Sequence, residues 1–191
     1  MTRYSNVKLL AFVGLPGSGM STAANYLRTK HFPSVYFGGV ILQAMNEAGL
    51  EHTAENERTF REQFRQNKGT TGVVDVIIPQ IYDLIEAGQH SIVLDGLYSW
   101  DEYKALKSEF PQSLTVVALT APRITRHRRL AIRPSRPLTN AEASQRDWSE
   151  IEQLQKGGPI AIADYFLENT GSVEELYENV EQLLDTIKFR L

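Results

Sequence analysis

The chain has 191 residues and a formal net charge of -3, with 42% hydrophobic and 23% charged residues, which is typical of a single folded globular domain. The acidic balance argues against nucleic acid or an anionic membrane as a partner, since both usually meet an excess of Lys and Arg. Cysteine is absent, which excludes disulfide bonds and thiolate metal sites.

The first predicted element is a strand over residues 8–13, an apolar run that follows the polar segment 1–6. This run is far shorter than a signal-peptide core or a membrane span. We therefore expect a cytoplasmic protein that does not enter a membrane. Further short apolar runs, each consistent with a strand, follow at 35–37, 91–94, 114–119 and 165–167.

Longer stretches with the apolar spacing of helices separate these strands. Thr53 is placed to cap a helix that reaches about Asn67, Pro122 suits a first helical turn, and Ser172 precedes a final helix with an apolar stripe. Strands that are apolar throughout suit a parallel sheet covered on both faces. The alternation predicts one α/β domain over 1–191, a doubly wound sandwich with five parallel strands.

Two segments interrupt this alternation. Residues 38–88 hold two or three helices and no convincing strand, which predicts an inserted helical lobe. Residues 132–146 are rich in Arg and Pro and have little periodicity, which predicts a mobile loop or lid. We expect both segments to move inward on a bound ligand and to exclude water from it.

A glycine-rich segment, Gly14–Thr22, joins the first predicted strand to the first helical stretch. Its glycines allow positive φ and close approach, so that successive backbone N–H groups can turn toward an anion at the helix N-terminus. The hydroxyl of Ser21 is then placed for a magnesium ion bound to the phosphates. We expect ATP, or GTP, with Mg²⁺ to bind through Gly14, Pro16, Gly17, Ser18, Gly19, Met20, Ser21 and Thr22.

Met20 occupies the position at which this phosphate-loop pattern has lysine. A charge-assisted hydrogen bond is worth about 1.5 to 3 kcal/mol, so the loss of the lysine predicts a phosphoryl transfer slower by about one to two powers of ten. Binding should suffer less, because the backbone amides and the helix N-terminus remain. A tight turn without a ligand is the alternative interpretation, and the sequence leaves open whether Met20 is natural or a laboratory replacement.

Asp95 ends the strand predicted at 91–94. In a parallel sheet its carboxylate would emerge beside the phosphate loop and bind Mg²⁺ directly or through water. A turn or helix-capping role is the alternative for an aspartate at such a point.

Arginine is concentrated after the fourth predicted strand. On a helix, Arg126, Arg129 and Arg133 share one face, and planar guanidinium groups pair well with phosphate oxygens. Such a face would clamp a triphosphate and neutralise charge during transfer. A solvated basic helix, paired with Glu142 or Glu150, is the alternative. The six arginines of this segment are Arg123, Arg126, Arg128, Arg129, Arg133 and Arg136.

With these motifs, nearly the whole chain resembles the nucleoside monophosphate kinase group of P-loop proteins, and within it the dephospho-CoA kinase relatives, including an uncharacterised archaeal branch. Residues 163–176 resemble the terminal strand, nucleotide-base loop and helix of dephospho-CoA kinases. The other segments that carry the resemblance are 14–22, 37–40, 49–56, 94–97 and 146–147.

The resemblance implies a three-layer P-loop NTPase sandwich that transfers the γ-phosphoryl group of Mg²⁺-bound ATP to a nucleotide-like small molecule, such as dephospho-CoA or a nucleoside monophosphate. It implies acceptor contacts from the helical lobe, an arginine-bearing lid, and magnesium-side positions at Ser21 and Asp95. The candidate residues are then Asp95, Arg126, Arg129 and Arg133 for catalysis, Asn169, Gly171 and Ser172 beside the base, and Gly38, Gly39, Arg61, Arg65 and Tyr98 for the acceptor.

Several family positions are altered besides Met20. The relatives' acidic residue after the second strand corresponds to Gly39, and two of their arginines correspond to Leu42 and to Tyr98 or Ser99. The acceptor is therefore open, and an unrelated alcohol also fits a lobe of this size. A non-catalytic nucleotide-binding protein is the rival interpretation that Met20 and Gly39 favour. A nucleic-acid-linked ATPase is a third, against which the acidic net charge argues.

Overall fold

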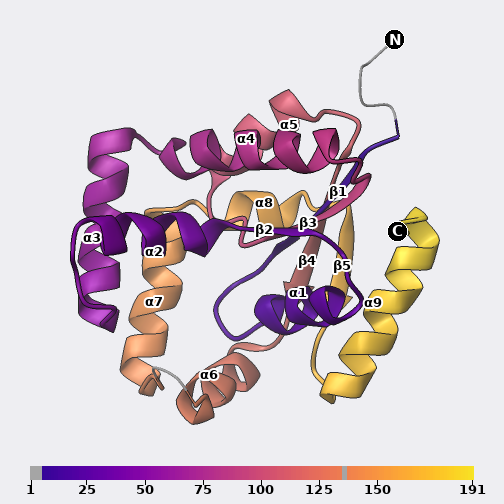
Figure 1. Ribbon diagram of the computed structural model, residues 1–191. Helices are drawn as coiled ribbons and strands as arrows, with labels where there is room; N and C mark the ends of the chain where they lie inside the picture. Colours follow the sequence, from indigo (N-terminus) through magenta and orange to yellow (C-terminus); the bar gives the residue numbers. More distant parts are fainter. Residues whose placement is uncertain (1–5, 135–136) are drawn as a thin grey trace.

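The protein is built around a parallel β-sheet (Figure 1). The computed structural model describes residues 6–134 and 137–191, and of positions 54, 55, 57 and 58 the backbone alone. Within these residues the sheet has five strands in the order β2-β3-β1-β4-β5, all pairs parallel, which confirms the predicted sheet. The strands are β1 (Lys8–Val13), β2 (Ser34–Tyr36), β3 (Ser91–Asp95), β4 (Leu114–Thr120) and β5 (Tyr165–Glu168).

The register of the central strands places the predicted functional segments at one edge of the sheet. β1 pairs with β3 so that Phe12 lies opposite Asp95, and Gly14 follows the last residue of β1. The carboxyl ends of parallel strands meet at the same edge, where ligands of open α/β sheets bind. The turn after β1 and the carboxylate that ends β3 therefore emerge on the same edge.

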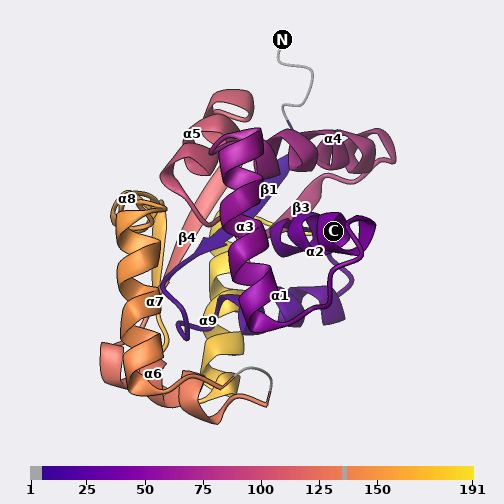
Figure 2. The same cartoon turned by 90° about the vertical axis from the view of Figure 1, so that its left-hand side faces the viewer.

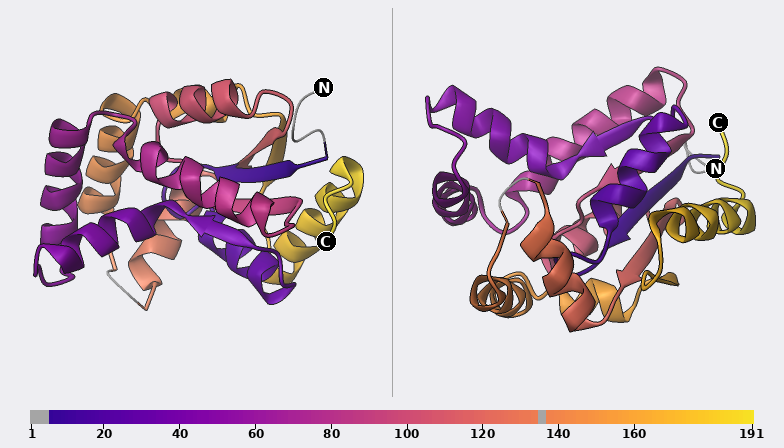
Figure 3. Two further views of the ribbon diagram at one scale, coloured as in Figure 1. Left: turned by 45° about the horizontal axis from the view of Figure 1, so that its top comes forward. Right: turned by 90° about the horizontal axis from the view of Figure 1, so that it is seen from below.

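Helices cover both faces of the sheet and form three layers with it. Side chains at alternate positions of β1 and β4 join α1 and α9 in one buried apolar cluster, and the other positions join α2 (Phe37–Glu47), α4 and α5 in a second. Figure 3, seen from below, shows α1 and α9 together on one face. The helices of these layers are α1 (Met20–Thr29), α4 (Gly72–Glu86), α5 (Trp100–Glu109), α8 (Gly157–Ala161) and α9 (Val173–Ile187).

The segment 38–88 is helical, as its periodicity predicts. It contains most of α2 (Phe37–Glu47), all of α3 (Ala54–Lys68) and α4. The Thr53 side chain caps α3 by accepting a hydrogen bond from the Asn56 amide at 3.1 Å. The strand predicted at 35–37 lies one residue earlier, because Phe37 already begins α2 and buries its ring in the core.

The prediction of an aperiodic loop over 132–146 is wrong for its second half. α6 (Arg123–Ile132) ends at the start of this segment, and α7 (Asn140–Glu152) begins within it. A capping box starts α7, since the Thr139 and Glu142 side chains each accept a hydrogen bond from the other residue's backbone amide. Residues 135 and 136, and with them Arg136, lie outside the described residues.

None of the helices in the part of the chain that the structure describes is long and apolar enough to span a membrane.

We expect Ile81→Ala to lower the free energy of unfolding by about 2 to 5 kcal/mol, because the fully buried Ile81 side chain lies in the core between α4 and the sheet. Val76→Ala on the same helix, where the residue is 42% exposed, should change stability by no more than about 0.5 kcal/mol. Urea denaturation measures both values. Equal losses in the two variants would contradict this assignment of the core face of α4.

Candidate functional site

The turn between β1 and α1 contains the predicted phosphate loop, Gly14–Thr22. Gly17 and Gly19 have φ angles of 81° and 109°, which residues with a Cβ rarely adopt. A Cβ atom on Gly17 would also meet the backbone of Arg126, and one on Gly19 would meet the amide of Asn169. Both glycines are therefore required by the backbone angle and by close packing.

Two side chains hold carbonyl groups of this loop from outside. Arg126 Nη1 donates a hydrogen bond to the Pro16 carbonyl at 3.0 Å, and Asn169 Nδ2 donates one to the Ser18 carbonyl at 2.8 Å. In a trans peptide the N–H points opposite to the C=O. The amides of Gly17 and Gly19 must then point away from Arg126 and Asn169, toward the other side of the loop.

The N-terminus of α1 extends this row of amides. Its N-cap is Gly19, and no side chain caps it, so the first N–H groups of the helix lack an intrahelical partner. The hydroxyl of Ser18 is buried without a hydrogen-bond partner among the described residues. Unpaired donors at a helix N-terminus attract an anion. The residues present therefore fit a polyphosphate group.

The side chain of Met20 does not contribute to this row of donors. It is partly buried and packs against the apolar cluster that α1, α9 and the sheet share. A thioether in this position offers no positive charge to a phosphate. The loop therefore relies on backbone amides where the sequence pattern has an ammonium group.

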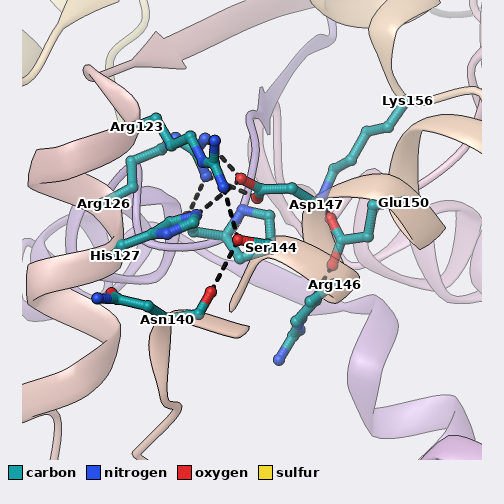
Figure 4. Close-up of polar contacts among 10 residues, drawn as sticks. Arg123, Arg126, His127, Asn140, Ser144, Arg146, Asp147, Glu150 and Lys156 are labelled. Atoms are coloured by element: carbon teal, nitrogen blue, oxygen red, sulfur yellow. Dashed lines mark hydrogen bonds and ion pairs between the residues drawn. The ribbon is translucent and has the colours of Figure 1, made fainter. Parts of the chain in front are cut away.

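A buried ion pair fixes Arg126 (Figure 4). Its guanidinium donates to both carboxylate oxygens of Asp147 on α7, at 2.7 and 2.9 Å, and His127 lies 3.0 Å from the same carboxylate. Burial raises the pKa of Asp147, but the hydrogen bonds from Arg126 and His127 outweigh it, and the pKa lies below its usual range. Figure 2 shows α6 and α7 at the end of the sheet where the loop lies.

The second support of the loop runs through the turn after β5. Arg129 Nη1 donates to the Asn169 carbonyl at 2.9 Å, and Arg129 Nη2 approaches the Gly171 carbonyl at 3.3 Å. Asn169 itself is 6% exposed. Ser172 caps α9 by accepting a hydrogen bond from the Glu175 amide. This turn is thus bonded to α6 on one side and to the phosphate loop on the other.

Asp95 lies buried at the end of β3 and is paired with a cation. Arg28 Nη2 of α1 donates to Asp95 Oδ2 at 2.7 Å, and the Arg28 side chain is itself 43% exposed. Burial raises the pKa of Asp95, and the charge of Arg28 opposes that shift without cancelling it. The carboxylate is at the predicted edge of the sheet, with a protein cation as its partner.

Tyrosine rings cover two of the glycine segments. The Tyr36 ring lies over Gly38 and Gly39, and the Tyr98 hydroxyl lies over Gly96, so that a Cβ on Gly38 or Gly96 would clash with the ring above it. Burial raises the pKa of Tyr98, and the nearby Tyr36 and Asp95 raise it further. The Tyr36 ring thus packs against Gly38 and Gly39, two of the predicted acceptor contacts.

Charged side chains gather beneath Tyr98. Lys156 is 1% exposed, its Nζ lies 5.1 Å from the centre of the Tyr98 ring, and it donates to Glu150 Oε2 at 2.7 Å. Glu102 Oε2 accepts hydrogen bonds from the backbone amides of Tyr98 and Ser99. Two of the predicted acceptor residues, Arg61 and Arg65, come from α3 to the same region, since Arg61 is close enough to act on the pKa of Tyr98.

Arg65 and Glu102 face each other with their closest atoms 3.9 Å apart. Burial lowers the pKa of Arg65 and raises that of Glu102, while the mutual attraction of the two charges opposes both shifts. The distance is too long for a hydrogen bond. The pair is therefore an ion pair, between Arg65 Nη2 and Glu102 Oε1, without a direct hydrogen bond.

The predicted arginine face is only partly present. Arg126 and Arg129 are both on α6, but Arg133 lies beyond its last residue, Ile132, in extended conformation. The reason is Pro134, because a residue before proline avoids the helical region. Arg126 is buried in its contact with Asp147, so its guanidinium supports the loop carbonyl and does not form an open clamp.

Sequence reasoning missed four residues of this region: Arg28, Glu102, Asp147 and Lys156. In the sequence, the segment 146–147 carries a family resemblance but no prediction of a role for Asp147. The spacing of Ser99 and Glu102 is a capping-box signal that would have placed Glu102 at the start of α5, beside Tyr98. The ion-pair partners of the other three come from other elements and leave no local signal.

Among the described residues no group of three His, Asp or Glu side chains is placed to hold a metal ion.

Comparison with known proteins agrees with this architecture. Residues 10–169 match the family model described as AAA domain. UPF0200 protein TK1334 of Thermococcus kodakarensis is 33% identical over 186 residues, covering 96% of this chain and 100% of that protein. The predicted resemblance to P-loop kinase relatives with an archaeal branch is confirmed.

Two solved kinases have the same fold. Shikimate kinase from Bacteroides thetaiotaomicron matches with a TM-score of 0.61 at 12% identity, covering 95% of this chain and 98% of that one. Dephospho-CoA kinase from Campylobacter jejuni matches with a TM-score of 0.58 at 14% identity, covering 94% and 96%. The predicted three-layer P-loop sandwich is confirmed.

We expect Asp147→Asn to lower the free energy of unfolding at pH 7 by about 3 kcal/mol, because it leaves the buried Arg126 without its counter-charge. The pKa of Asp147 is lowered by folding, so its contribution is complete above the unfolded-state value of about 3.9 and is lost below it. The stability difference between the two proteins should therefore stay constant from pH 7 to about 5 and shrink below pH 4.

Chemical denaturation at several pH values measures this difference. Asp101→Asn is the matched control, because its carboxylate pairs with Lys104 at the surface and should contribute less than about 1 kcal/mol. A loss for Asp147→Asn no larger than the control's, or one that persists unchanged at pH 2, would contradict the role of the pair.

Proposed function

We propose that this chain, which belongs to the UPF0200 family and to the AAA domain family, transfers the γ-phosphoryl group of ATP or GTP to a small molecule. The observation that carries this proposal is the orientation of the phosphate loop. Arg126 and Asn169 hold the carbonyls of Pro16 and Ser18, and the amides of Gly17 and Gly19 point the other way. The unpaired amides that begin α1 continue the row.

In the proposed reaction the protein positions two substrates and stabilises charge without a covalent intermediate. The acceptor oxygen forms a new bond to the γ phosphorus, and the bond from that phosphorus to the β–γ bridging oxygen breaks. The nucleoside diphosphate leaves with the electron pair, and the acceptor hydroxyl proton passes to a base or to solvent. Backbone amides cost no reorganisation when negative charge builds up on the phosphate oxygens.

Magnesium is the cofactor we propose, with the Ser21 hydroxyl and the Asp95 carboxylate on its side of the phosphates. Asp95 ends β3, and Ser21 lies in the first turn of α1, which follows the neighbouring strand β1 at the carboxyl edge of the sheet. A bound magnesium ion would neutralise charge on the phosphates. Asp95 would then pair with the magnesium ion in place of Arg28, or with both cations. The Arg28 side chain is half-exposed.

Residues on the lobe side of the sheet edge are the proposed acceptor contacts. Arg61 and Arg65 come from α3, and Tyr98 follows β3. The two similar solved proteins are named shikimate kinase and dephospho-CoA kinase. The fold does not select among the candidate acceptors, which are dephospho-CoA, a nucleoside monophosphate and an unrelated alcohol. We further propose that the segment predicted as a lid, residues 132–146, moves inward on the bound ligand.

A non-catalytic nucleotide-binding protein is the second candidate. Two observations favour it: the apolar packing of Met20, and the ion pair that already engages Asp95. Such a protein would bind ATP or GTP with the same backbone amides, close on the nucleotide and signal through its lid.

Met20→Lys separates the two functions. We expect it to raise the rate of phosphoryl transfer by about 10- to 100-fold, because the added ammonium group supplies about 1.5 to 3 kcal/mol to the transferring phosphate. The assay follows radiolabelled γ-phosphate from ATP to water and to shikimate, gluconate, dephospho-CoA, AMP and CMP. Met20→Leu, which keeps the apolar packing, should behave like the unaltered chain.

Nucleotide binding without turnover in all three proteins would reject the phosphotransferase and support the non-catalytic candidate. Absence of nucleotide binding in all three would reject both.

A further inference from the structure

The side chain of Asn169, in the turn after β5, is engaged with the phosphate loop. It is buried, and its Nδ2 donates a hydrogen bond to the Ser18 carbonyl at 2.8 Å. The same amide group packs against Gly19, where a Cβ would clash with it. The Asn169 backbone amide donates to the Thr120 carbonyl at the end of β4, at 2.8 Å. Asn169 therefore connects the sheet to the loop.

Arg129 fixes the orientation of this side-chain amide. Arg129 Nη1 donates to the Asn169 carbonyl at 2.9 Å, and Nη2 approaches Asn169 Oδ1 at 3.4 Å. A guanidinium group can only donate hydrogen bonds. The side-chain oxygen of Asn169 therefore faces Arg129, and its NH₂ group faces the Ser18 carbonyl.

Other polar groups of the turn are also engaged within the protein. Arg129 Nη2 approaches the Gly171 carbonyl at 3.3 Å. Ser172 Oγ accepts a hydrogen bond from the Glu175 amide, and the Ser172 amide donates one to the Glu175 carboxylate. The Thr170 side chain is exposed. Its hydroxyl both donates and accepts, so it suits either kind of partner.

These contacts leave the turn poorly suited to select between adenine and guanine. Adenine carries an amino donor where guanine carries a carbonyl oxygen. The carbonyls of Asn169 and Gly171 could accept that amino group, but both face the guanidinium of Arg129. The NH₂ group of Asn169 could donate to guanine, but it is buried against the loop.

We propose that Asn169 is a positioning residue for the phosphate loop and that the nucleotide site binds ATP and GTP alike. This inference rests on the proposed function and names the nucleotide class of the same site. Asn169 acts on the phosphates through the orientation of the loop. A base beside Gly171 and Ser172 would gain packing there, without a hydrogen bond that only one purine can make.

The unaltered chain provides the first test. Titration calorimetry with Mg²⁺ measures the Kd of ATP, of GTP and of inorganic tripolyphosphate, which has no base. We expect the Kd values of ATP and GTP to lie within about fivefold of each other. This comparison needs no substitution and so does not depend on the folding of a variant.

Asn169→Asp is the second test, because it places an oxygen where the NH₂ group faces the Ser18 carbonyl. We expect its Kd to rise about 10-fold for ATP, for GTP and for tripolyphosphate alike, since the loop that binds the phosphates loses its orientation. Asn169→Ala removes the same donor without adding an oxygen and should act in the same direction. Thr170→Ala, on the exposed side of the turn, is the matched control and should leave all three Kd values unchanged. Thermal melting checks that each variant is folded.

Three outcomes would overturn the inference. The unaltered chain prefers one purine nucleotide by more than about fivefold, the folded Asn169 variants bind all three ligands as the unaltered chain does, or they weaken one purine nucleotide and spare tripolyphosphate, as loss of a base contact would. Failure of ATP, GTP and tripolyphosphate alike to bind the unaltered chain would reject the proposed function itself. The two failures are therefore distinguishable.

Discussion

The opposed directions of N–H and C=O in a trans peptide are the constraint on which the proposed site depends. Arg126 and Asn169 each hold one carbonyl of the loop, and in doing so they orient the next amide to the opposite side. Glycines at 17 and 19 permit the backbone angles and the close approach that this arrangement needs. A loop oriented in this way offers dipoles that are fixed before a ligand arrives, which is the condition under which backbone amides stabilise an anion well.

The two supports connect the loop to the rest of the molecule. Arg126 is held by Asp147 of α7, and one turn later on the same helix Glu150 holds Lys156 beneath Tyr98. α7 therefore contacts, through ion pairs, both the proposed nucleotide side and the proposed acceptor side of the sheet edge. Asn169 is held in turn by Arg129, which ties α6 to the turn that follows β5. Charged side chains in this part of the molecule serve mainly to place backbone groups and each other.

Much of the fold follows from the sequence because its signals are local. Apolar runs, helical spacing and cap residues such as Thr53 and Ser172 predict the strands, most helices and the parallel sheet. The phosphate loop is predictable for the same reason, since its glycines adjoin a strand and a helix. The roles of the arginines are harder to predict from the sequence, because a guanidinium group can bind a buried carboxylate as well as a phosphate. Spacing puts Arg126 on a helix face, but only the packing of α7 against α6 brings Asp147 to it.

Backbone amide NMR of the unaltered chain, titrated with Mg²⁺ and ATP, tests most directly whether the loop with Met20 in place of lysine binds phosphate. We expect the amide resonances of Gly17, Gly19 and Ser21 to shift in proportion to occupancy and to saturate, with the largest changes in the chain at this turn. Saturating nucleotide that leaves these amides unmoved, or that shifts residues elsewhere instead, would contradict the assignment of the loop as the phosphate site.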